Sequence, residues 1–212
     1  MKKGPYYRIL QTIRHHGFYY DKEDFYRSFI DQYCMEEALT LLTKENNSIH
    51  KTGLVIAPYD IQFGIQLNEL VTKIGMPTFQ QKDINDLNDH RILFYKTNLL
   101  RQRVLTQFHF LKEFLYYAQI TFLGYSDKTN ATLLNSVKDK YQCPVSFDGL
   151  DKLCLTDGDD NKLIVEKGIY LTVSYISGDS FPRKVIEEQM RTKKEMLTRA
   201  DNYDLERLSR LI

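Results

Sequence analysis

The densest group of potential metal ligands is the run Asp157-Gly158-Asp159-Asp160-Asn161, where four side chains carry carboxylate or amide oxygens. Such oxygens are the ligands that Ca²⁺ prefers. An EF-hand loop, however, has its glycine sixth and a bidentate glutamate twelfth, whereas here the acids crowd a short stretch between two apolar runs. Asp-Gly between strand-like runs is a strong hairpin signal. We therefore expect a hairpin turn and no metal site.

The histidines and cysteines are too scattered to indicate a catalytic or zinc site. None forms H-x-x-x-H or lies at zinc-ligand spacing from a cysteine; the histidines are His15, His16, His50, His90 and His109. The chain has no G-x-S-x-G, P-loop or G-x-G-x-x-G motif. We expect no catalytic residue and no cofactor. An enzyme with a site between two modules is the alternative.

Basic and aromatic residues alternate near the N-terminus, in residues 2–8 and 18–22. Stacking platforms for single-stranded nucleic acid have this composition. Asp21, Glu23 and Asp24 cancel much of the charge, and aromatic residues at this density also fill cores and interfaces. Binding of single-stranded nucleic acid is a second alternative.

Two alternating runs, 103–111 and 114–123, predict a hairpin with one apolar and one polar face. With the turn at Lys112, Phe110 lies opposite Phe114 and Phe108 opposite Tyr116. Antiparallel sheets commonly bury one face, so we expect the polar face to be wet. It combines arginine and tyrosine, which are enriched at protein contacts, and the predicted binding residues are Arg101, Arg103, Gln107, His109, Tyr117 and Gln119. An ordinary solvated sheet surface is the simpler interpretation.

A near-repeat predicts how these elements are organised. Residues 67–78 return 67 positions later as residues 134–145, with Leu, Asn, Lys and Pro in place. In each copy an amphipathic helix ends before a proline and strand-like sequence follows, which indicates two successive helix-plus-sheet modules. The predicted fold is α+β, with an N-terminal helical segment, two modules and a C-terminal helix, over 1–52, 53–126, 127–179 and 180–212.

Within these bounds the apolar periodicity predicts individual elements. The first module has a helix over 65–74 and strands over 54–56, 92–95, 103–111 and 114–123, with 80–90 as a polar connection. The second has strands over 153–156, 163–166 and 169–176. The C-terminal helix has a thin apolar stripe that must dock on the body or on another chain, and we expect a possible break near Asp201.

Composition excludes several classes of partner. Lys+Arg 29 against Asp+Glu 28 leaves a net charge of +1, so no overall field attracts nucleic acid or an anionic membrane. No apolar run reaches the ~20 residues of a membrane span, and residues 4–8 interrupt any export signal. Cys34, Cys143 and Cys154 are odd in number and widely spaced, which favours a reducing compartment. We expect a cytoplasmic bacterial protein.

The repeated helix, ending in Ile74-Gly75-Met76-Pro77 and followed by an antiparallel meander, resembles the tandem modules of the β-lactamase-inhibitor-protein-like fold. That fold is shared with small bacterial outer-membrane assembly lipoproteins. The resemblance covers about 53–178 and implies a binding module with a continuous sheet face and no catalysis. The chain departs from it in lacking an export signal, a lipobox and paired cysteines. We expect a non-enzymatic protein-binding or adaptor protein that contacts a protein partner or a second copy through its polar sheet faces or its C-terminal helix.

Overall fold

The computed structural model describes residues 22–30, 49–82, 87–99, 102–124, 127–143 and 152–209, and within these ranges it describes the side chains except at 22–24, 30, 49, 127–130 and 200–209. Its helices are α2 (Lys22–Ile30), the 3₁₀ turn η1 (Pro58–Asp60), α4 (Leu67–Ile74), α5 (Asp127–Lys140) and α6 (Ser180–Ser209). Its strands are β1 (Ile49–Lys51), β2 (Phe79–Lys82), β3 (His90–Leu99), β4 (Gln102–Leu111), β5 (Phe114–Phe122), β6 (Lys152–Thr156), β7 (Lys162–Lys167) and β8 (Leu171–Ile176). The expected α+β class, with a long C-terminal helix, is confirmed.

The described strands form one sheet in the order β1-β6-β7-β8-β5-β4-β3-β2. β1 runs parallel to β6, and every other pair is antiparallel. The meander β3-β4-β5 follows α4 along the chain, and the meander β6-β7-β8 follows α5. The two meanders join through their last strands, β5 and β8. That the two units are copies of one module stays a prediction.

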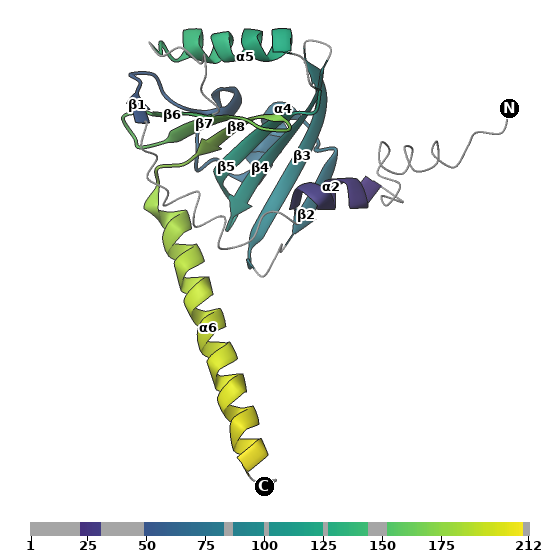
Figure 1. The fold of residues 1–212 in the computed structure, drawn as a ribbon, viewed down its shortest axis with the longest axis vertical. Helices are drawn as coiled ribbons and strands as arrows, with labels where there is room; N and C mark the ends of the chain where they lie inside the picture. Colours follow the sequence, from purple (N-terminus) through teal and green to yellow (C-terminus); the bar gives the residue numbers. More distant parts are fainter. Residues whose placement is uncertain are drawn as a thin grey trace, which may run out of the picture.

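One face of the sheet carries the main core, beneath α4 and α5 (Figure 1). Leu67 and Leu70 of α4 are buried there in one cluster with Phe108, and Leu134 and Val137 of α5 pack against the same cluster. Burial of each such side chain stabilises the fold by roughly 1.5–3 kcal/mol. Both predicted repeat helices therefore lie on the same side of the sheet.

The opposite face of the sheet is covered as well, although the sequence predicted a polar surface exposed to solvent there. Val185 and Ile186 of α6 pack into a second apolar cluster with Tyr117. At the β2 edge, Tyr26 of α2 stacks on Phe79 with 4.7 Å between ring centroids. Strands that are buried on both faces cannot be assigned to one wet side by alternation alone.

Residues 53–66 differ most from the prediction. The apolar run Leu54–Ile56 forms no strand, because the backbone N–H of Ile56 donates to Oδ2 of Asp157 at 2.8 Å instead of pairing with a neighbouring strand. Tyr59 and Asp60 then adopt positive φ angles of 52° and 58°. Two short strands were not predicted: β1, and β2 within residues 79–82 at the start of the expected polar connection.

The β4–β5 hairpin is real, but its predicted register is wrong. Lys112 and Glu113 both have positive φ, 49° and 70°, as in a two-residue type I′ turn. This turn places Phe110 opposite Leu115, one residue further along than predicted, and a bulge after His109 shifts the pairing by one more residue, so that Phe108 faces Ala118. In α6, the possible break near Asp201 is not observed, because the helix is continuous from Ser180 to Ser209.

Candidate functional site

The polar residues predicted to bind a partner are mostly buried. Gln107, His109 and Tyr117 are 3%, 1% and 4% exposed, and Gln119 is half-buried. Arg103 is exposed, and Arg101 lies outside the described residues. The expectation of a solvent-exposed face is therefore wrong for most of this set, because other parts of the protein cover it and its polar groups bond to one another.

A histidine pair forms one half of this buried network. Nδ1 of His109 lies 3.3 Å from Nε2 of His90, and the hydroxyl of Tyr116 lies 3.3 Å from the same Nε2. Burial lowers the pKa of His90 to about 3. Burial, and then the charge on His90, lower the pKa of His109 well below its ordinary value. Both imidazoles are therefore neutral near pH 7.

Amides and hydroxyls form the other half. Gln107 of β4 lies directly opposite Gln119 of β5, and its Nε2 donates to Oε1 of Gln119 at 3.3 Å. The Tyr117 hydroxyl lies 3.3 Å from Oγ of Ser174 on β8. Buried polar groups need partners of this kind, because an unsatisfied one costs about 1–3 kcal/mol. The network is thus part of the folded interior and not a contact surface.

An enzyme needs ionisable groups that a substrate can reach. His90 and His109 lie within hydrogen-bonding distance, but each is only 1% exposed. Among the described residues no cluster of His, Cys, Asp or Glu could hold a metal ion. The histidine pair is therefore better suited to packing than to proton transfer with a substrate.

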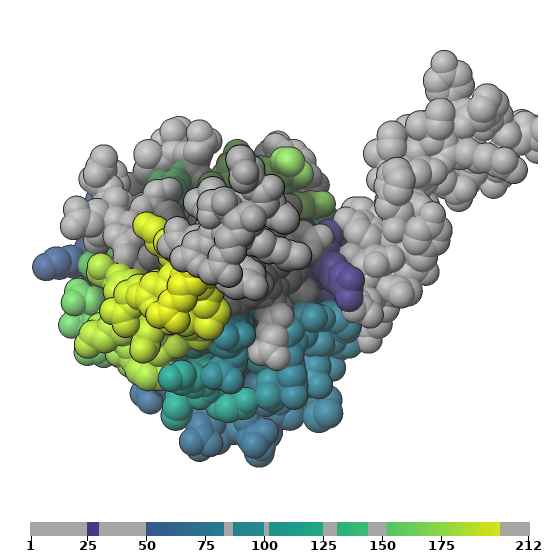
Figure 2. Space-filling view, turned by 90° about the horizontal axis from the view of Figure 1, so that it is seen from below, coloured from purple at the N-terminus to yellow at the C-terminus, as the bar shows by residue number. Residues whose placement is uncertain are grey.

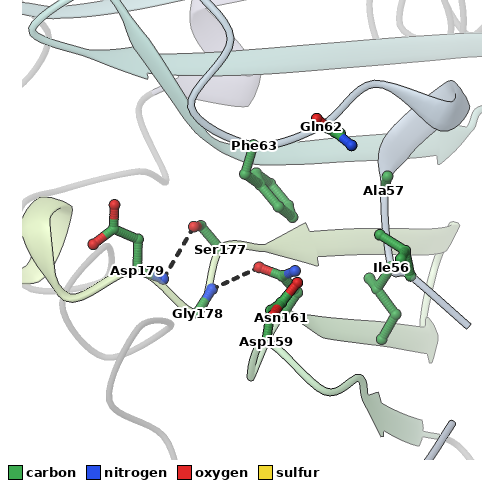
Figure 3. A pocket seen from close by; sticks show the side chains of 10 residues that line it. Ile56, Ala57, Gln62, Phe63, Asp159, Asn161, Ser177, Gly178 and Asp179 are labelled. Carbon is green, nitrogen blue, oxygen red and sulfur yellow. Dashed lines mark hydrogen bonds between the residues drawn. The ribbon is translucent and has the colours of Figure 1, made fainter. Parts of the chain in front are cut away.

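A cavity of about 420 Å³ lies beside the β6–β7 turn, at the opposite end of β7 from the β7–β8 turn (Figure 3). We call it the acidic pocket, and its lining residues are Val55, Ile56, Ala57, Gln62, Phe63, Asp159, Asn161, Ser177, Gly178 and Asp179. Figure 3 shows the Phe63 ring pointing toward the hairpin turn, with Asp159 and Asn161 opposite it. Among the described residues, the lining holds two carboxylates and no basic residue. Its chemistry suits a cationic group on an apolar stem.

Asp157 holds three lining residues of the acidic pocket, Ile56, Asp159 and Asn161, together by hydrogen bonds. Its Oδ1 accepts the backbone N–H groups of Asp159 and Asn161, both at 2.9 Å. Its Oδ2 accepts the backbone N–H of Ile56 at 2.8 Å and the side-chain amide of Asn161 at 3.0 Å. The expected hairpin over 157–161 is confirmed. The sequence did not predict the link to Ile56, which lies 101 residues away.

Residues 177–179, which also line the pocket, directly precede α6. The N–H of Gly178 donates to Oδ1 of Asn161 at 2.9 Å, and a Cβ at Gly178 would collide with the Asp159 carbonyl. Oδ1 of Asp179 accepts the N–H of Phe181 at 2.9 Å, at the beginning of the helix. Asp179 therefore serves as a cap for α6 as well as a lining residue of the pocket.

α6 leaves the body soon after it begins. Val185 and Ile186 are buried and Met190 is half-buried, but every side chain from 191 to 199 is exposed. Figure 1 shows the helix projecting away from the sheet, and Figure 2, seen from below, shows it nearly end-on. We call residues 191–199 the projecting segment. Met196 and Leu197 are 64% and 57% exposed in it, and its four basic residues outnumber one acid, a net charge of +3.

The remaining sequence candidates contribute little to a site. The N-terminal basic and aromatic residues 2–8 and 18–21, with His15 and His16, lie outside the described residues. His50 is half-buried on β1. No helix in the described part of the chain has the length and apolar character needed to cross a membrane.

Comparison with known proteins gives no functional assignment. No family model and no curated protein matches the chain. Among solved structures, it is similar to an extracellular protein containing an SCP domain from Bacillus anthracis str. Ames, with a TM-score of 0.29 and 15% identity. The match covers 66% of this chain and 52% of that one, so the chain spans about half the length of the protein it matches. A similarity this low carries no argument about fold or function.

Proposed function

We propose that this protein is a non-enzymatic protein-binding module, and that the projecting segment of α6 is its contact surface. The observation that carries the proposal is the exposure of Met196 and Leu197 on a helix that no described element packs against beyond Met190. Exposed apolar side chains among polar ones are a common feature of protein contact sites. The sheet serves as the rigid base that orients the helix.

The polar sheet face, which the sequence favoured as the contact surface, is a weaker candidate. Most of its described residues are buried and bonded to each other, so a partner would first have to displace the elements that cover them. Displacement exposes apolar surface and breaks hydrogen bonds, both of which cost free energy. Binding through the projecting segment needs no such rearrangement.

A capture experiment with the full chain as bait tests this surface. We expect the double variant Met196→Ser/Leu197→Ser to recover about tenfold less of the proteins that the wild type retains from native lysate, because two apolar anchors are lost. Its melting temperature should hardly change, since both side chains are exposed. The matched control is Ile169→Ser, which removes an apolar side chain that is 87% exposed in the β7–β8 turn.

Equal recovery by the wild type, the double variant and the control contradicts the proposal. A nuclease treatment of the lysate separates the classes of partner. If nuclease abolishes the recovery that depends on Met196 and Leu197, the segment binds nucleic acid and the protein-binding proposal is wrong.

A further inference from the structure

We propose that the partner of the projecting segment is a second copy of this chain, and that the segment docks in the second copy's acidic pocket. This inference rests on the proposed function, because it uses the same segment of α6. It adds the identity of the partner and the place where the segment is received.

Charge complementarity is the first argument. The projecting segment carries Arg191, Lys194 and Arg199 among its basic residues and has a net charge of +3. The acidic pocket carries Asp159 and Asp179, and no basic residue is found among its described lining residues. Opposite potentials across an interface speed association and select the partner.

The apolar groups also match. Met196 and Leu197 stand exposed between the basic residues of the segment. The acidic pocket offers Phe63 and Ile56 within a cavity of about 420 Å³, next to Val55, which is itself exposed. An unbranched Met side chain and the methylene stems of Lys and Arg adapt well to such a surface. Both parts of the segment's composition therefore find a counterpart in the pocket.

Geometry excludes docking within one molecule and favours an exchange between two. The pocket includes Ser177 to Asp179, immediately before α6 begins, whereas Glu195 lies about 22 Å further along the helix. The helix runs away from the sheet (Figure 1), so it carries the segment away from residues 177–179 of its own pocket. If two copies place their α6 helices antiparallel, each segment reaches the other's pocket, and the contact is isologous and closed.

Sedimentation velocity of the full chain over a concentration series tests the inference. We expect a monomer–dimer equilibrium that weakens as salt is raised, because salt screens exposed charges. Lys194→Glu and Asp159→Lys should each raise the dimer Kd by about tenfold or more. Lys167→Glu, an exposed lysine at the far end of β7, is the control and should leave the Kd unchanged.

Mixing the two charge-reversed proteins gives the decisive result. In their heterodimer, the new carboxylate at position 194 of one copy meets the new ammonium group at position 159 of the other, while the second contact keeps its native charges. We therefore expect the Lys194→Glu and Asp159→Lys proteins to associate with each other more tightly than either associates with itself. This pattern requires that positions 194 and 159 face each other across the interface.

Two results overturn the inference. One is a wild type that stays monomeric up to about 1 mM, a concentration at which even a weak specific contact is populated. The other is a dimer whose Kd neither charge reversal changes. If the protein is monomeric while capture from lysate still depends on Met196 and Leu197, this inference is wrong and the proposed function stands with a different protein as partner.

Discussion

Replacing Asp157 by alanine should lower the free energy of unfolding by about 3 kcal/mol, because the substitution leaves several inward-facing donors without an acceptor. The carboxylate is buried and accepts four hydrogen bonds, from Ile56, Asp159 and twice from Asn161. It fixes the hairpin turn and ties the 53–66 segment to it. Urea denaturation at pH 7 measures the loss.

Asp159→Ala is the matched control. Asp159 lies two residues away in the same turn, is exposed, and contributes its backbone N–H, which the substitution keeps. We expect its effect to stay within about 0.5 kcal/mol. Similar losses for Asp157→Ala and Asp159→Ala would contradict the role assigned to the buried carboxylate.

Acidification should destabilise the protein through the His90–His109 pair. In the unfolded chain both side chains titrate near pH 6.5, whereas burial holds the pKa of His90 at about 3 and that of His109 well below its ordinary value. Their contribution to stability is fully present above pH 6.5. Below pH 6.5 these two histidines bind protons in the unfolded state but not in the folded state. Each of them therefore lowers the free energy of unfolding by about 1.4 kcal/mol per pH unit.

The comparison between pH 7 and pH 5 isolates the histidines, because most carboxylates titrate lower. His109→Gln keeps a polar side chain and removes one titrating group, so it should reduce the slope of unfolding free energy against pH by about half in this window. Denaturant titrations at pH 7, 6 and 5 measure both slopes. Equal slopes would show that His109 takes up a proton in the folded state.

The strands with strong alternation could be predicted from the sequence, and the reason is local. β5 and β8 carry apolar residues at every second position, and β4 does so apart from Thr106, which is the pattern that a pleated strand requires on its core face. β1 and β2 have three and four residues with little apolar character. Their pairing depends on neighbours outside the segment itself, so local pattern gave no signal.

The exposure of the polar face could not be predicted, because polarity does not distinguish water from an internal partner. Gln107 and Gln119 satisfy each other across β4 and β5, and Tyr117 reaches Ser174 on a strand that is 57 residues away in sequence. The bulge after His109 also breaks the simple alternation of faces, because the consecutive residues Tyr116 and Tyr117 both lie in the second apolar cluster. Alternation predicts two faces but not what covers them.

The sequence predicted only part of the candidate site. The Asp-Gly signal identified the hairpin turn over 157–161, but the acidic pocket also needs residues 55–63 and 177–179, which the fold brings together. The apolar stripe of α6 was recognised as needing a partner. The sequence could not show that, within residues 180–199, the apolar residues of α6 that pack on the body are Val185, Ile186 and Met190 in its first turns.

Photo-crosslinking from within α6 tests the central claim most directly, namely that the protein makes contacts through the projecting segment. A benzophenone amino acid is placed at Leu197 in one protein and at Ile169, which is also exposed, in another. We predict protein adducts from position 197, either with a second copy or with another protein of the native lysate, and few from position 169. Absence of adducts at 197, or the same yield at both positions, would contradict the account.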